Sequence, residues 1–95
     1  MDPVISVRFS EMYEKSYGPV YAYAARRVGR EVAEEVVADT FLVAWRRFDE
    51  LPEQPLPWLY GVARNVVLRH RSLLARQEAV KQAVCSQPRV ALGGG

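Results

Sequence analysis

Residues 31–48 read Glu-Val-Ala-Glu-Glu-Val-Val-Ala-Asp-Thr-Phe-Leu-Val-Ala-Trp-Arg-Arg-Phe, and this stretch decides the fold. Its apolar positions step by three or four residues, which is the spacing of one buried face of an α-helix. That stripe consists of Ala33, Val37, Phe41, Ala44 and Phe48, widened by Val36, Val43 and Trp45. Acidic residues occupy the first turns and two arginines the last, an order that complements the helix dipole. The stretch is therefore predicted to be a helix with one face in the core.

The preceding segment also has helical spacing. A first helix is predicted to begin near Ser10, a suitable cap, and to end at Gly29. Its apolar side consists of Phe9, Met12, Tyr13, Tyr17, Val20, Tyr21, Ala24 and Val28. Gly18 and Pro19 interrupt it, because proline lacks an N–H donor and clashes with the preceding turn. We expect a kink or a break there.

On the other side of the stretch, residues 49–57 contain three prolines and are predicted to form a stiff, extended loop. A third helix is predicted to start at Pro57 and to continue to about Ala83. Leu59, Val62, Ala63, Val66 and Leu73 form its apolar side. No alternating strand pattern is longer than a few residues.

The predicted fold class is all-α, a compact bundle of three to four helices with short connections. Residues 9–76 form the helical domain, residues 1–8 a lead-in, and residues 77–95 a helix extension, linker and frayed tail. No segment has the composition of a signal peptide or the length of an apolar membrane span, so we expect a cytoplasmic protein.

Few residue types suited to catalysis occur in this sequence. One His and one Cys allow no His/Cys metal cluster and no Cys-His dyad, and no Ser has a plausible base. The prediction is a protein without catalytic residues, metal or cofactor. Cys85 is interpreted as an incidental reduced thiol, and His70 as a solvated or DNA-facing residue rather than a ligand.

Charge is distributed unevenly. Residues 1–56 hold seven basic and ten acidic residues, whereas residues 57–95 hold six basic residues and one acid, Glu78. An acidic half beside a basic half indicates a protein partner at one surface and a polyanion at another.

Three segments carry a resemblance to one family. Residues 31–48 resemble region 2.2 of bacterial RNA polymerase sigma factors of the extracytoplasmic-function (ECF) group. Residues 58–71, Trp-Leu-Tyr-Gly-Val-Ala-Arg-Asn-Val-Val-Leu-Arg-His-Arg, resemble the Trp-Leu-x-x-Ile-Ala-Arg-Asn pattern of regions 2.3 and 2.4. Residues 17–21, Tyr-Gly-Pro-Val-Tyr, resemble region 2.1. The three occur in the family's order and cover about residues 9–76, which implies a sigma region 2 fold.

The resemblance implies that the helix of residues 31–48 docks on the clamp coiled coil of the polymerase largest subunit. The corresponding positions are Glu34, Glu35, Ala38, Asp39 and Leu42. Carboxylates around an exposed leucine suit a helix-on-helix interface with a basic partner. The charge pattern alone also fits a solvated acidic face. Ala38 departs from the glutamine usual in the family, which removes a hydrogen-bonding group.

The loop and third helix correspond to the surface that melts and reads the minus-ten element, mainly on the single non-template strand. Glu53 and Gln54 are predicted to line a pocket for one flipped base, although the loop could equally be a plain connector. The other predicted DNA-binding residues are Trp58, Tyr60, Arg64, Asn65, Arg69 and Arg71. Aromatic faces and guanidinium groups suit single-stranded DNA. Trp58 lies beside the apolar stripe, which favours the core, and Arg69 departs from the family's aspartate.

The predicted function is that of a sigma factor domain that binds core RNA polymerase and opens promoter DNA, with an anti-sigma factor as a further partner. The alternative is a helical protein-interaction module that docks through its acidic helix and never contacts nucleic acid. The promoter-reading helix-turn-helix of region 4 has no counterpart after Arg76. We therefore expect an excised or truncated domain.

Overall fold

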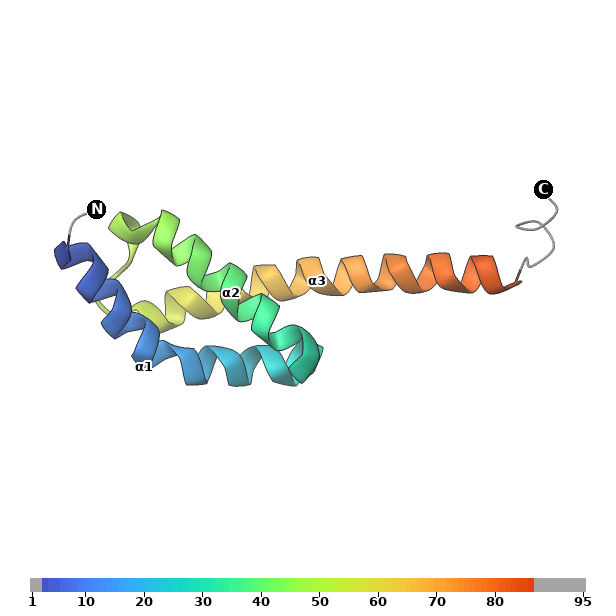
Figure 1. Cartoon of the computed structure of the whole chain (residues 1–95), viewed down its shortest axis with the longest axis horizontal. Helices are drawn as coiled ribbons and strands as arrows, with labels where there is room; N and C mark the ends of the chain where they lie inside the picture. Colours follow the sequence, from blue (N-terminus) through green and yellow to red (C-terminus); the bar gives the residue numbers. More distant parts are fainter. Residues whose placement is uncertain (1–2, 87–95) are drawn as a thin grey trace.

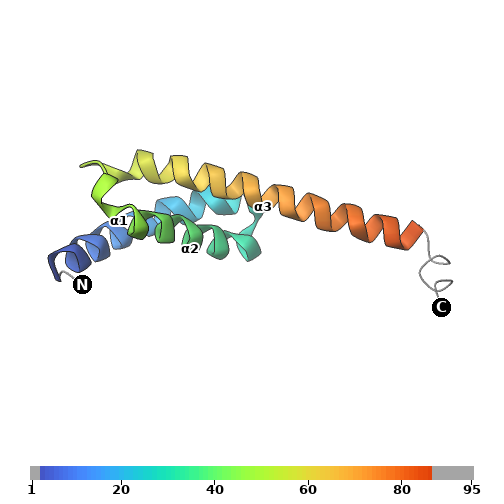
Figure 2. The ribbon, with the colours of Figure 1, turned by 90° about the horizontal axis from the view of Figure 1, so that it is seen from above.

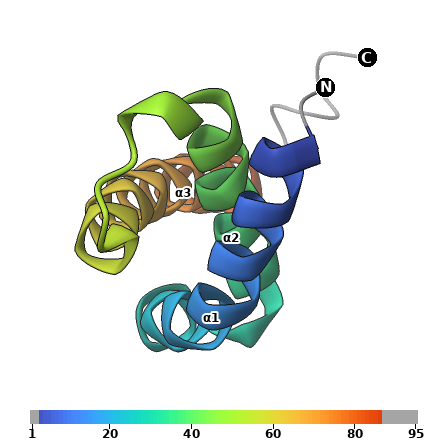
Figure 3. The ribbon, with the colours of Figure 1, turned by 90° about the vertical axis from the view of Figure 1, so that its left-hand side faces the viewer.

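Three α-helices follow one another in the computed structural model, which describes residues 3–86 (Figure 1). α1 spans Pro3–Val28, α2 spans Arg30–Arg46, and α3 spans Pro55–Ser86, with a short 3-10 helix, η1, at Phe48–Glu50. Each α-helix packs against the other two, as the end-on view shows (Figure 3). The prediction of an all-α bundle is confirmed. Within residues 3–86, no helix is long and apolar enough to cross a membrane.

α1 starts earlier than predicted, and it has the kink that was expected near Pro19. It begins at Pro3 rather than near Ser10, because proline fits the first turn of a helix, where the N–H groups have no intrahelical acceptor. It also runs through Pro19 without a break. Figure 1 shows the axis of α1 changing direction between its two halves, which is the kink that proline causes by removing one backbone hydrogen bond.

Gly29 alone joins α1 to α2, and the first helix ends there as predicted. The Gly29 N–H donates to the Ala25 carbonyl at 2.9 Å, and the Gly29 carbonyl accepts from the Ala33 N–H at 3.0 Å. Its φ of 83° lies where residues with a Cβ are strained. A single residue with this backbone conformation therefore connects the two helices directly.

The connection between α2 and α3 is shorter than predicted. Residues 49–57 were expected to be extended, but Asp49 and Glu50 belong to η1, and α3 begins at Pro55 rather than at Pro57. Pro55 and Pro57 are the first and third residues of α3. Neither position needs an N–H for an intrahelical bond, so both prolines are compatible with the helix.

The core lies where the three helices meet and is built from small and branched side chains. Seven residues in it are completely buried: Val20 and Ala24 of α1, Ala33, Val36 and Ala44 of α2, and Leu59 and Ala63 of α3. Thr40 is also buried, and its hydroxyl donates to the Val36 carbonyl at 2.7 Å. Phe48 is only half-buried. Leu73, predicted to be apolar core, is 49% exposed, because α3 continues past the other helices (Figure 2).

Aromatic rings extend the core along α1 and α2. Phe9 meets Trp45 edge to face, with ring centroids 5.0 Å apart, and Tyr13 meets Phe41 at 4.8 Å. Such pairs stabilise a contact beyond the area they bury. They fix the N-terminal half of α1 against the C-terminal half of α2.

Candidate functional site

One side of α2 forms the acidic face, which we define as Glu34, Glu35, Ala38, Asp39 and Leu42. All five residues are exposed, as their spacing predicts. Leu42 is 44% exposed although it is a large apolar residue. The buried residues of α2 occupy the other side of the helix, so the acidic face is available to a partner.

His70 of α3 contacts this acidic face. Its Nε2 lies 3.2 Å from Asp39 Oδ2, and its Nδ1 lies 3.9 Å from Glu35 Oε2. Only 17% of the His70 side chain is exposed. The interpretation of His70 as a solvated residue is therefore wrong, because the packing of α3 on α2 turns its ring toward two carboxylates. Within residues 3–86, no three His, Cys, Asp or Glu side chains are grouped to hold a metal ion.

Tyr17 of α1 borders the acidic face. Partial burial, with a smaller contribution from the Glu34 carboxylate, raises the pKa of its hydroxyl. The hydroxyl therefore stays neutral and offers both a donor and an acceptor at the edge of the face. Sequence spacing predicted Tyr17 only as an apolar position.

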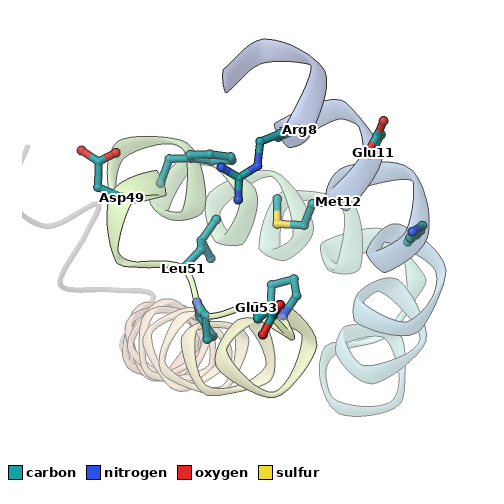
Figure 4. A pocket seen from close by; sticks show the side chains of 10 residues that line it. Arg8, Glu11, Met12, Asp49, Leu51 and Glu53 are labelled. Atoms are coloured by element: carbon teal, nitrogen blue, oxygen red, sulfur yellow. The ribbon is translucent and has the colours of Figure 1, made fainter. Parts of the chain in front are cut away.

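The loop between η1 and α3 closes one side of a cavity of about 560 Å³. Glu53 lines this cavity, and Gln54 does not belong to its lining. Arg8 and Met12 point in from α1 and Leu51 from the loop, whereas Asp49 and Glu11 point away (Figure 4). The Arg8 guanidinium carbon lies 5.6 Å from the centre of the Phe48 ring. Arg8 and the lining residue Lys15 had no signal in the sequence, because α1 approaches the loop only in the folded chain.

Arg47 stabilises the connection between α2 and α3. Its guanidinium donates twice to the Glu50 carboxylate, at 2.7 and 3.1 Å, and lies 5.7 Å from the Trp58 ring centre. The hydrogen bond from Arg47 lowers the pKa of Glu50. Trp58 is half-buried and packs against the core, which agrees with the core assignment considered for it.

A second surface joins the C-terminal half of α1 to α3. The Tyr60 ring lies 5.3 Å from the Tyr23 ring, and the Arg27 guanidinium stacks over Tyr23 at 3.7 Å. Arg71 donates two hydrogen bonds to the Arg27 carbonyl, at 3.0 and 3.3 Å. Arg64 is exposed one turn after Tyr60. We call these five residues the aromatic-basic patch.

The aromatic-basic patch unites only part of the predicted DNA-binding set. Tyr23 and Arg27 belong to it although sequence analysis did not select them, because they lie in the acidic half of the chain. Arg69 does not join it: five residues after Arg64, it lies about 140° around the helix and borders Asp39 and His70 instead. Asn65 is exposed.

Comparison of the chain with models of known protein families finds a match to one family. The family model described as Sigma-70 region 2 matches residues 12–77, which include α2, η1 and most of α1 and α3. Comparisons with curated proteins and with solved structures give no match.

Proposed function

Because this chain belongs to the sigma-70 region 2 family, whose members bind core RNA polymerase and take part in promoter recognition, we propose that it melts and reads the minus-ten element as an ECF-type domain. The ECF resemblance of residues 17–21, 31–48 and 58–71 supports the subgroup. The family is a non-catalytic transcription-factor domain, so the chain acts by binding. This activity belongs in the cytoplasm, where polymerase and promoter meet.

The acidic face of α2 is the proposed docking site for the polymerase clamp coiled coil. Three carboxylates precede Leu42 on the same side of α2, so the face offers an apolar anchor and a charge pattern that suits a basic helix. Ala38 is small and leaves room for close approach. His70 contacts Asp39 at 3.2 Å from the side of α3, which orients this carboxylate before docking.

The aromatic-basic patch is the proposed surface for the opened strand. The placement of Tyr60, Arg64 and Arg71 on one side of α3, opposite in charge to the acidic face, is the observation that supports this most strongly. Bases stack on aromatic rings, and phosphates pair with guanidinium groups. The cavity beside Glu53 is the proposed pocket for one unstacked base, with Arg8 and Lys15 as candidate partners for its phosphate.

Two finer assignments accompany this proposal. An anti-sigma factor is a further proposed partner, because a protein that covers the acidic face would block polymerase binding. The competing function is an interaction module that uses only the acidic face. Both functions use the acidic face, so this face does not distinguish the sigma factor domain from the interaction module. Contact with DNA does distinguish them.

The test is fluorescence anisotropy with a labelled non-template minus-ten oligonucleotide, measured for the chain alone and with core polymerase at several salt concentrations. The probes are a panel of oligonucleotides that differ from one another at single positions, so that the preferred sequence is found by the measurement itself. The free domain should bind weakly, because its small surface supplies few contacts to the strand. Core polymerase should increase the affinity. Binding to the clamp fragment without any binding to DNA in either setting would establish the interaction module instead.

A further inference from the structure

Beyond Arg71, α3 extends past the packed part of the bundle. Residues 72–86, which we call distal α3, are all exposed, and Figures 1 and 2 show this part projecting beyond the ends of α1 and α2. A helix that leaves its bundle for four turns is not stabilised there by packing. A solvated helix of this kind would be polar all round.

Distal α3 carries an apolar stripe instead. Val66, Leu73 and Val80 are seven residues apart, and Val84 follows four residues later. This heptad-like spacing continues the face on which Val66 is buried in the core, past the point where the core ends. Leu73, Val80 and Val84 are 49%, 62% and 55% exposed. Among the described residues, five of the nine exposed large apolar side chains lie between Leu68 and Val84.

Basic side chains border this stripe on both sides. Arg76 and Lys81 lie about 60° and 80° to either side of Leu73 around the helix, whereas Glu78 lies about 140° away. A cavity of about 340 Å³ opens at the inner end of the stripe, lined by Leu73, Arg69 and Arg76 together with Asp39, His70 and Ser72. The stripe thus ends in a concave site that contains two arginines.

We propose that distal α3 docks an amphipathic helix with acidic flanks, supplied by another protein. The apolar stripe would pack against the apolar side of that helix, and Arg76 and Lys81 would pair with its carboxylates. A second copy of this chain fits less well, because two distal α3 helices would bring like charges together. Nucleic acid fits less well, because it would leave the apolar stripe unused.

This inference is independent of the proposed function. Distal α3 contains no residue of the acidic face or the aromatic-basic patch, although its cavity adjoins the acidic face at Asp39. Its test needs neither polymerase nor promoter DNA, so failure of one proposal is distinguishable from failure of the other.

The experiment measures binding of the full chain to three labelled synthetic helices of about four heptads. The first probe has Leu at the a and d positions and Glu at e and g. The second replaces Glu by Lys, and the third keeps Glu but replaces Leu by Gln. The first probe should bind at least about tenfold more tightly than the other two, since both the apolar seam and the opposite charge are required.

Matched variants locate the site. Leu73→Ala should weaken binding of the first probe about five- to tenfold, as loss of an apolar anchor does. Leu68→Ala should change it less than about twofold, because Leu68 is equally exposed, at 48%, but lies on the far side of α3. Arg76→Glu should weaken binding about five- to tenfold, whereas Arg26→Glu, an equal change of charge on α1, should have little effect.

Three results would overturn the proposal. One is equal affinity for the acidic and basic probes. A second is equal loss of affinity in Leu73→Ala and Leu68→Ala. The third is dimerisation of the chain without any probe, measured by sedimentation equilibrium and abolished by Leu73→Ala, which would assign the stripe to a second copy.

Discussion

At Gly29 the backbone has φ of 83° and ψ of 163°, a region that only glycine occupies readily. No atom lies within 4 Å of a Cβ built at this position, so a side chain would meet no steric obstacle from its neighbours. The constraint is therefore in the backbone itself. Because Gly29 is the whole connection between α1 and α2, its conformation sets the angle at which the acidic face and α1 meet.

Gly29→Ala should lower the free energy of unfolding by about 1–3 kcal/mol, the usual cost of an L-residue in this backbone region. Chemical denaturation followed by circular dichroism measures the loss. Gly61→Ala is the matched control, since Gly61 is helical and exposed with open space around its Cβ, and it should stabilise slightly. Equal effects of the two substitutions would mean that the Gly29 conformation imposes no strain.

Leu42 and Asp39 make separate contributions to the acidic face. Leu42→Ala should weaken binding to a clamp coiled-coil fragment by about 1–2 kcal/mol, as an apolar anchor does. Asp39→Arg should weaken it through like-charge repulsion. Titration calorimetry measures both affinities.

Circular dichroism shows whether these two variants stay folded. Leu42→Ala should keep its helicity, because the side chain is 44% exposed. Asp39→Arg should lose a small amount of stability, since it also removes the contact with His70 at 3.2 Å. His70→Ala, which removes that contact and leaves the acidic face intact, is the control. Unfolding of Leu42→Ala would place this residue in the core.

At the scale of elements, the spacing of apolar residues predicted the three helices, but it placed their ends poorly. The errors occurred at prolines. Pro3 was placed in a lead-in and Pro55 in an extended loop, yet both lie in first turns of helices, where no backbone N–H is needed. Pro19 bends α1 without ending it, because packing on the other helices holds both halves. The sequence shows where a proline lies, but packing between helices determines whether that proline starts, bends or ends a helix.

In the loop between η1 and α3, the neighbouring residues Glu53 and Gln54 are predicted to differ in their effect on base preference. Glu53→Ala should alter which base is preferred near the upstream edge of the minus-ten element, because Glu53 lines the cavity of about 560 Å³. Gln54→Ala should alter it less, because Gln54 lies outside that lining. The salt dependence of binding should hardly change, since no phosphate-binding cation is lost. Anisotropy on the oligonucleotide panel measures both properties. Identical base preferences in all three proteins would leave the loop as a connector.

At the scale of the whole molecule, folding brings residues from the acidic half and the basic half of the sequence onto shared surfaces. The acidic face is predictable from the sequence, because one helix carries all of it. Only the α3 side of the aromatic-basic patch is predictable in this way, because Tyr23 meets Tyr60 and Arg27 meets Arg71 across long stretches of chain. Likewise, the contact between His70 and Asp39 joins residues that are 31 positions apart. Residues on one helix are predictable from spacing, and residues brought together by packing are not.

Single-strand binding should depend on this assembled patch in two distinguishable ways. Arg64→Ala should lower the magnitude of the log–log salt slope by about 0.7, because one phosphate contact and its released counterion are lost. Tyr60→Ala should cost about 1–3 kcal/mol of binding with little change in slope, because stacking releases no counterion. Tyr60→Phe, which keeps the ring, is the control.

Arg71→Ala should show a combined effect. Its guanidinium holds the Arg27 carbonyl at the end of α1 while remaining exposed, so its loss should lower both the salt slope and the melting temperature. Arg64 makes no such contact in the described structure, so Arg64→Ala should change the slope alone. The measurement is anisotropy from low to moderate salt, with thermal unfolding of each variant. Equal slopes in the wild-type chain and both arginine variants would remove the phosphate contacts from the aromatic-basic patch and leave stacking on Tyr60 as its sole means of binding.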